Sequence, residues 1–187
     1  GINSKAIPET TAEGPAWALM DAHQAVGMVA GHAGMRTAAL KAQITGVGIA
    51  TVRYSNHFGA ASAYTLMALD HGMAGIAMSN TDVVMNIPGG CGAMIGNNPL
   101  SYAIPAGKHP ALVLDIAMST VAGGKVYSAK VQGKPIPEGW LTDREGLPTT
   151  DPNVFTVDGA LTPFAAHKGY GLAMLVESFA GVLAGAA

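Results

Sequence analysis

The chain has 187 residues, of which 49% are hydrophobic and 12% charged, and its formal net charge is -2 at pH 7. This length suits one domain with its own core, and the low charge predicts that further domains or identical subunits cover part of its surface. Because there is no basic run, we expect no nucleic acid and no membrane as partner, and a small molecule is favoured. The single Cys91 excludes an intramolecular disulfide and fits a reducing, cytoplasmic setting.

The first half of the chain alternates between strand and helix patterns. Apolar runs, helix-forming residues and glycine stops predict, in order, a strand over 15–20, a helix over 26–44, a buried strand over 47–54, a helix from about 58 to 70 and a strand over 74–79. This β-α-β-α-β rhythm predicts that part of the sheet is parallel. The opening residues mix charged, polar and proline positions, so we do not expect them to form a signal peptide.

The second half is richer in strand patterns. Strands are predicted over 100–104 and 111–115, which makes the sheet mixed. Residues 133–163 carry five prolines and predict a long ordered loop over the surface rather than an interdomain linker. A last helix is predicted from near Tyr170 to the end of the chain, and its Glu177 and internal glycines favour a buried core helix over a membrane span. The fold class expected is therefore α/β, a mixed sheet with flanking helices.

A glycine-dense run, Gly89–Gly96, has the composition of a phosphate-binding loop but not the context of one. A Rossmann fingerprint follows a strand directly and opens a helix, whereas this run follows Pro88 and leads into a predicted strand. A P-loop is excluded because no Gly-Lys-Ser/Thr is present. Tight turns and close backbone approach are the favoured interpretation.

His57 stands in Ser55-Asn-His-Phe-Gly59, where a predicted strand meets a predicted helix. Ligands of open α/β sheets sit at the carboxyl ends of strands, so a site is expected here. If Ser55 caps the helix, His57 lies in its first turn, where the helix dipole disfavours imidazolium and leaves a neutral base. A base of this kind can take the hydroxyl proton when an alcohol is oxidised by hydride loss. A histidine that only caps or packs is an equally good interpretation of the pattern.

Two further charged residues are candidates. Asp115 closes a predicted strand, where a carboxylate can bind ribose hydroxyls, orient a catalytic group or cap the segment that follows. Lys168 stands at the start of the last predicted helix, whose N-terminus favours an anion, although a solvated surface lysine is the common alternative. The remaining histidines show no metal-ligand spacing, so we expect no bound metal.

Six blocks of sequence form a pattern together. The blocks are Ser55-Asn-His-Phe-Gly59, Gly96-Asn-Asn-Pro-Leu100, Leu114-Asp-Ile-Ala-Met-Ser119, Ile136-Pro-Glu-Gly-Trp140, Pro148-Thr-Thr-Asp-Pro152 and His167-Lys-Gly-Tyr-Gly171. In their order and spacing, these blocks resemble the malate/L-lactate dehydrogenase family. The resemblance covers essentially the whole chain. It implies a non-Rossmann α/β fold that binds NAD or NADP, and a homodimer or higher oligomer.

The resemblance also implies roles for single residues. His57 matches the histidine that is the proton acceptor in ureidoglycolate dehydrogenase-like members, Thr81 matches a cofactor-contacting hydroxyl and Lys168 matches a cofactor-contacting lysine. The stretch Asp115, Ile116 and Ala117 matches a cofactor-binding segment. The implied activity is hydride transfer between NAD(P)H and a small 2-oxo acid, such as those related to malate, lactate or ureidoglycolate. A cyclic imino acid substrate and a non-catalytic dinucleotide-binding or assembly fragment stay open as alternatives.

Two departures from the family pattern limit what the chain does alone. The family begins with a segment, not found in this chain, that holds a Ser-His-Gly motif and an arginine suited to a substrate carboxylate, and the family continues past the last predicted helix. We therefore expect residues 1–187 to be the central NAD(P)-binding domain of a longer chain, inactive alone. Asn97 stands where the family more often has threonine.

Overall fold

A computed structural model describes residues 1–185 of the chain. Its contacts divide the chain into two compact units, which we call unit 1 and unit 2. Unit 1 combines Gly1–Met78, Leu100–Asp115 and Ser178–Ala187, and unit 2 combines Ser79–Pro99 and Ile116–Glu177. Neither unit is a continuous stretch of chain, so each depends on contacts between distant parts of the sequence.

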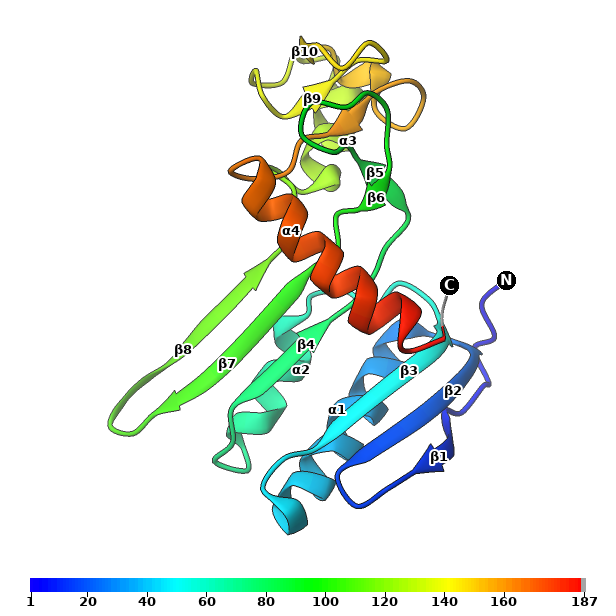
Figure 1. Cartoon of the computed structure of the whole chain (residues 1–187), viewed down its shortest axis with the longest axis vertical. Helices are drawn as coiled ribbons and strands as arrows, with labels where there is room; N and C mark the ends of the chain where they lie inside the picture. The colour runs from blue at the N-terminus through cyan, green and yellow to red at the C-terminus, as the bar shows by residue number, and fades with distance from the viewer. Residues whose placement is uncertain (186–187) are drawn as a thin grey trace. The chain divides into compact units, whose positions relative to one another are not determined.

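The first sheet of unit 1 has three strands, β1 (Glu9–Glu13), β2 (Trp17–Ala25) and β3 (Ile49–Ser55), in that order (Figure 1). β1 is antiparallel to β2, and β2 is parallel to β3. The predicted strands over 15–20 and 47–54 are confirmed in position. The expectation that the second one is buried is wrong, because β3 lies at an edge of its sheet and Ile49 is 57% exposed.

Helix α1 (Gly27–Thr45) makes the crossover between the parallel strands β2 and β3. It confirms the predicted helix over 26–44, and Gly46 ends it in the left-handed conformation (φ 82°) with its N–H donating to the Ala42 carbonyl. Its buried positions, Gly27, Ala30, Gly34 and Ala39, are all small. Small side chains on this face let the helix axis come close to the sheet.

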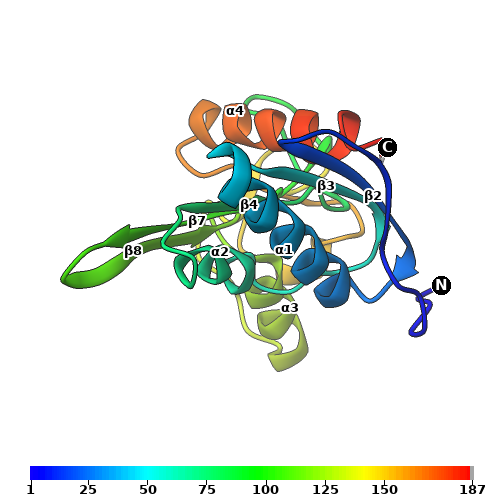
Figure 2. The same ribbon diagram turned by 90° about the horizontal axis from the view of Figure 1, so that it is seen from below.

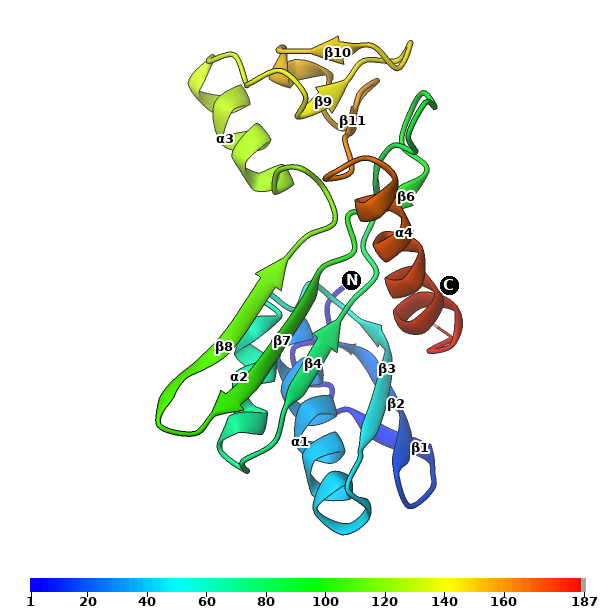
Figure 3. The ribbon, with the colours of Figure 1, turned by 60° about the vertical axis from the view of Figure 1, so that its left-hand side comes forward.

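The second sheet of unit 1 contains β4 (Gly75–Met78), β7 (Leu100–Ala106) and β8 (His109–Ile116), with β7 in the middle. These strands confirm the predictions over 74–79, 100–104 and 111–115. Helix α2 (Ser62–Leu69) packs on β4 and β7 and also contacts α1. The two helices lie side by side in Figure 2, and Figure 3 shows them on one face of the strands of unit 1.

Unit 2 is built on a five-stranded mixed sheet of very short strands. Their order is β10 (Pro148–Thr149), β9 (Leu141–Thr142), β11 (Ala160–Leu161), β5 (Val83–Met85) and β6 (Ile95–Gly96). β11 is parallel to β5, and the other pairs of neighbouring strands are antiparallel.

Around this sheet lie helix α3 (Gly123–Gln132), which the sequence did not predict, and the 3-10 turn η1 (Pro152–Val154). The largest fully buried side chains of the unit include Met85, Met118 and Leu141. The predicted long loop over 133–163 is wrong in part, because three strands and η1 fall within it. Each of those strands has only two residues, too few to show a periodic pattern.

The last helical segment consists of α4 (His167–Val176) followed by the π-helical turn η2 (Glu177–Val182). The helix begins before the predicted Tyr170, and the final part of the prediction, 186–187, lies outside the described residues. The expected burial is found only in part, since Ala173 and Val176 are buried whereas Phe179, Val182 and Leu183 are each more than half exposed. Within residues 1–185, no helix combines the length and apolar character needed to cross a membrane.

Candidate functional site

His57 lies in unit 1, in the connection that follows β3 and precedes α2, and its residue is exposed. The predicted helix from about 58 begins instead at Ser62. His57 is therefore not in a helical turn, and the helix-dipole argument for a neutral imidazole is wrong. What the structure gives His57 is a defined place at the carboxyl end of a strand that runs parallel to its neighbour.

Asn56, the residue before the histidine, binds this connection to the end of β2. The Asn56 side-chain amide donates to the carbonyl oxygens of Gln24 (2.9 Å) and Ala25 (3.0 Å). Gly27, the first residue of α1, packs directly on the same backbone: a Cβ atom there would stand 2.0 Å from the Asn56 carbonyl oxygen and 2.3 Å from that of His57. The start of α1 and the backbone that carries His57 thus fit together only because residue 27 is glycine.

Tyr64 of α2 holds the residue after the histidine. Its hydroxyl donates to the Phe58 carbonyl oxygen, and the two rings stack with centroids 5.1 Å apart. Burial raises the pKa of the Tyr64 phenol, so this group keeps its proton and remains a donor. With Asn56 on one side and Tyr64 on the other, the backbone at His57 is fixed while its side chain stays exposed.

Asp115 in β8 is the second predicted site residue of unit 1. Its Oδ2 accepts the N–H of Ser62, the first residue of α2, at 2.8 Å. The carboxylate therefore caps a helix that is distant in sequence, one of the ordinary roles of such a residue, instead of capping the segment that follows it. By holding α2, Asp115 also supports the position of Tyr64 and of the connection that carries His57.

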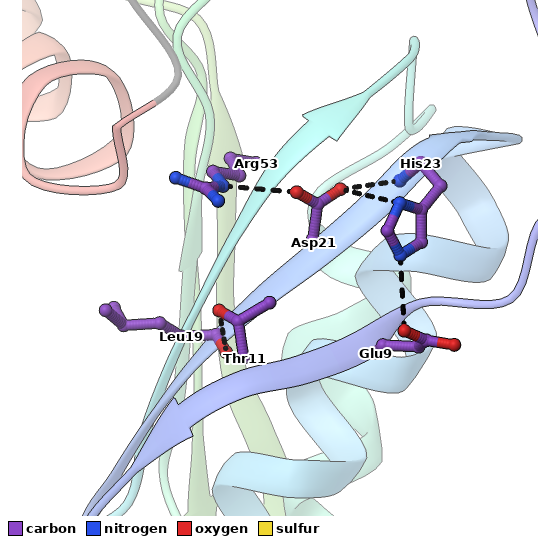
Figure 4. Close-up of polar contacts among 6 residues, drawn as sticks. All are labelled: Glu9, Thr11, Leu19, Asp21, His23 and Arg53. Atoms are coloured by element: carbon purple, nitrogen blue, oxygen red, sulfur yellow. Dashed lines mark hydrogen bonds and ion pairs between the residues drawn. The ribbon is translucent and has the colours of Figure 1, made fainter.

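A cluster of charged residues lies on strands β1, β2 and β3 and consists of Glu9, Asp21, His23 and Arg53 (Figure 4). Asp21 and Arg53 are register partners, with the Arg53 Nε 3.3 Å from the Asp21 Oδ2. The other oxygen accepts the His23 backbone N–H (2.9 Å) and faces its ring, which in turn approaches Glu9 at 3.4 Å. The His23 N–H, and then the charges of His23 and Arg53, hold the pKa of the Asp21 carboxyl below its usual value in spite of partial desolvation.

Backbone strain accompanies this cluster. His23 (φ 50°), Gln24 (φ 64°) and Tyr54 (φ 53°) adopt the left-handed conformation, which is unfavourable for residues other than glycine. Asp21 offsets this cost by accepting the His23 N–H. Since Gln24 also supplies a carbonyl for Asn56, the cluster shapes the backbone to which the His57 connection is fastened.

In unit 2, Thr81 lies in the connection before β5. Its Oγ1 donates to the Asn97 Oδ1 (2.9 Å), and its N–H donates to the Asn98 Oδ1 (3.0 Å). Ile116, the last residue of β8, and Ala117 are half-buried, and the next residue, Met118, donates its N–H to the Asn97 carbonyl. The structure thus links two of the predicted cofactor-binding segments through the Asn97-Asn98 pair.

Lys168 is the second residue of α4 and is exposed. The two residues before the helix, Ala165 (φ 45°) and Ala166 (φ 51°), are both strained. Gly169 is buried, and a Cβ there would meet the Phe164 carbonyl oxygen at 2.5 Å, so the first turn is packed tightly. A helix N-terminus with an ammonium group beside it is suited to binding an anion such as a phosphate.

A cavity of about 640 Å³ lies within unit 2, and its wall begins at Asp82, the residue after Thr81. The wall also includes Arg144, Phe155 and Asp158. The volume is in the range of small-molecule sites. Because the two carboxylates on the wall outnumber the one guanidinium, the cavity suits an uncharged group better than a phosphate.

The structure distributes the predicted site residues over both units. Unit 1 holds His57 and Asp115, which α2 connects, and unit 2 holds Thr81, Ile116, Ala117 and Lys168.

Sequence reasoning missed Asn56 and Asn98 as anchors, although both stand inside blocks that resemble the family. It also missed Asp21, a carboxylate directly after the predicted strand over 15–20 that the structure places within β2. No group of three or more metal-ligating side chains is found in the part of the chain that the structure describes.

The whole sequence, residues 1–187, matches the family described as malate/L-lactate dehydrogenase. It is 40% identical over 192 residues to a malate dehydrogenase of Pyrococcus horikoshii, covering 99% of this chain and 53% of the relative. It is 39% identical to an Escherichia coli ureidoglycolate dehydrogenase (NAD(+)), covering 92% and 48%.

Solved structures agree with the sequence match. The delta1-piperideine-2-carboxylate reductase of Pseudomonas syringae superimposes with a TM-score of 0.91 at 33% identity, covering 98% of this chain and 55% of that one. The chain spans about half the length of the curated relatives it matches. The expected α/β fold with mixed sheets is confirmed. On the full-length sequence match and these identities, the chain belongs to the malate/L-lactate dehydrogenase family.

Proposed function

We propose that the protein containing this chain is an NAD(P)-dependent dehydrogenase that reduces a small 2-oxo acid to the 2-hydroxyacid and catalyses the reverse reaction. The observation that carries the proposal is the exposed imidazole of His57 on a backbone fixed by Asn56, Gly27 and Tyr64. Relatives whose names give malate and ureidoglycolate as substrates support the substrate class.

The residues of unit 2 fit a dinucleotide. The N-terminus of α4 with Lys168 suits a phosphate, and the Thr81 hydroxyl, held by Asn97, suits a hydrogen bond to a neutral part of the cofactor. Ile116 and Ala117 add half-buried apolar surface and backbone next to these polar groups. When bound, the nicotinamide ring exchanges the hydride with the substrate carbon.

His57 exchanges the proton. In reduction, the imidazolium donates to the carbonyl oxygen as the hydride reaches the carbon, and in oxidation the neutral ring takes the proton back from the hydroxyl. The fixed backbone reduces the number of orientations the ring must search before the proton is transferred. Asp115 acts indirectly, because its hydrogen bond to Ser62 holds α2 and thus Tyr64 in place.

His57→Ala, made like every variant below in the full-length protein that contains this chain, is the direct test of this role. The substitution should lower kcat by about 100-fold or more while cofactor affinity stays near that of the wild type, because only proton transfer is lost. Steady-state turnover of NADH with 2-oxo acids and fluorescence titration of NADH measure the two quantities. The exposed His109 provides a matched control, and near-normal turnover of His57→Ala would remove His57 from the mechanism.

Lys168→Ala tests the cofactor site. Loss of one charge-assisted contact to a phosphate should raise the Kd of NADH or NADPH by about ten-fold. Lys125→Ala is the matched control, since it also removes an exposed lysine from the first turn of a helix, α3. An unchanged Kd in Lys168→Ala refutes the assignment of Lys168 to the cofactor.

A cyclic imino acid is the second candidate substrate. The observation that favours it is the close structural match to delta1-piperideine-2-carboxylate reductase. Comparing kcat/KM for a panel of 2-oxo acids and cyclic imino acids, each with NADH and with NADPH, separates the two substrate classes and the two cofactors. Turnover of imino acids alone would replace the first candidate with the second.

A further inference from the structure

We infer that Asn98 is a positioning residue of the cofactor site: it fixes Thr81 to helix α4, whose first turn carries Lys168. The inference rests on the proposed function, because it concerns two residues proposed to contact the cofactor. All the groups involved belong to unit 2, so the contacts are internal to one compact body.

The Asn98 side chain is completely buried and every polar atom on it is used. Its Oδ1 accepts the Thr81 N–H at 3.0 Å. Its Nδ2 donates to the Ala173 carbonyl at 3.0 Å and to the Glu177 Oε2 at 2.8 Å. A buried amide with all its bonds made is a strong geometric constraint, since any shift of either partner leaves a polar group unpaired.

The contact on α4 falls where the helix changes its hydrogen-bond pattern. Glu177 ends α4, its N–H donates to both Ala173 and Met174, and the π-helical turn begins there. A side chain that donates to a helix carbonyl competes with the regular pattern and marks such changes. Asn98 therefore anchors one defined point of the helix.

Glu177 completes the connection from the other side. Its Oε1 accepts from the Asn80 amide at 3.5 Å and its Oε2 accepts from Asn98. One carboxylate therefore binds both the residue before Thr81 and the residue that accepts the Thr81 N–H. This accounts for a carboxylate in an otherwise apolar helical segment. The Thr81 hydroxyl donates to Asn97, which leaves its lone pairs available to accept from a ligand.

The test is Asn98→Asp, alone and together with Glu177→Gln. The aspartate keeps an acceptor for the Thr81 N–H but faces the Glu177 carboxylate, which should displace Thr81 from α4 and raise the Kd and KM of NADH by about ten-fold with little change in kcat. In the double variant the side-chain amide introduced at position 177 can donate to the new carboxylate, and the Kd should return to within about three-fold of the wild type. Affinity is measured by NADH fluorescence titration well below the unfolding temperature.

Asn153→Asp is the matched control. It also places a new carboxylate beside an existing one, Asp151, but on an exposed turn of unit 2, and it should leave the Kd unchanged. If Asn98→Asp does not fold, Glu177→Gln alone is informative, because it weakens the bond to Asn98 and should raise the Kd by about two- to five-fold.

The outcomes separate this inference from the function on which it rests. Wild-type affinity in a folded Asn98→Asp variant, or in Glu177→Gln when the first does not fold, overturns the positioning role. So does a lower unfolding temperature without any change in Kd or KM, which is the result of a purely structural role. A wild-type protein that binds neither NADH nor NADPH refutes the proposed function itself and removes the basis of the inference with it.

Discussion

At the scale of single residues, the features that support His57 are groups of no chemical reactivity. Asn56 provides two amide hydrogen bonds, Tyr64 one hydroxyl, and Gly27 only the absence of a side chain. Each acts on the backbone next to the histidine. The position of the proposed proton donor is thus a property of its neighbours, and it is sensitive to substitutions that leave His57 unchanged.

Asp21 allows a prediction of pH dependence. Because its folded-state pKa is lowered, its carboxylate stabilises the folded state above the unfolded-state pKa of about 3.9, and the contribution is lost as the pH falls through the folded-state value. Asp21→Asn should therefore be less stable than the wild type at pH 7 and approach it below about pH 3. Urea unfolding at the two pH values measures the difference.

The exposed Asp70 at the end of α2 provides the control for Asp21. Asp70→Asn should change the unfolding free energy little at either pH, since exposed charges contribute little. A stability gap between Asp21→Asn and the wild type that stays constant down to pH 3 contradicts the electrostatic role of Asp21.

The sequence pointed to candidate reactive residues, whose roles remain predictions, but not to the residues that support them. His57 and Lys168 were predicted from charged or basic groups at strand and helix ends, which is local information. Asn98 satisfies partners on two other segments, and a single asparagine in a glycine- and asparagine-rich block does not reveal them. For Asp115, capping was among the predicted roles, but the helix it caps lies 53 residues earlier in the chain.

At the scale of elements, the approach of α1 to the His57 connection gives a sharp test. Gly27→Ala forces the helix and the Asn56 and His57 backbones apart, because a Cβ atom cannot stand 2.0 Å from a carbonyl oxygen. We expect a loss of about 1–3 kcal/mol in the free energy of unfolding, as for overpacking, together with a lower kcat. Chemical unfolding and NADH turnover measure the two effects.

The control for Gly27 is Gly124→Ala in α3, where a Cβ would meet no atom within 4 Å. Alanine is the better helix former, so this variant should be more stable by up to about 1 kcal/mol and should turn over normally. Equal stability changes in the two variants would show that crowding at Gly27 is absorbed without cost.

Several elements were predictable because apolar runs, helix-forming residues and glycine stops describe them. The helix ended by Gly46 and the strands β4, β7 and β8 are examples. Strand β1 was missed because all five of its residues are exposed and show no apolar alternation. The start of α2 was placed too early: the helix begins at Ser62, and Phe58, which stacks on Tyr64, lies in the connection before it.

At the scale of the whole molecule, exposed apolar side chains occur in both units. Examples are Ile44 (86%), Ile76 (64%) and Leu183 (65%) in unit 1 and Val131 (74%) in unit 2. Further parts of the polypeptide or identical subunits can cover these side chains, and the family resemblance predicts that the protein is a homodimer or higher oligomer.

Light scattering after size exclusion, over a range of protein concentrations, measures the mass in solution. A mass of at least twice that of the single chain supports self-association. A concentration-independent monomer mass would contradict it and would assign the cover of these side chains to other parts of the same polypeptide.

The two strained alanines before Lys168 have a consequence for evolution and engineering. Glycine at Ala165 or Ala166 relieves a conformation that costs an L-residue about 1 kcal/mol or more, so gains in stability are within reach of one substitution at each position. Glycine also loosens the entrance to α4, and with it the lysine proposed to hold the cofactor. In this short segment, selection for stability of the fold therefore opposes selection for cofactor binding. A variant stabilised here is expected to bind the cofactor more weakly.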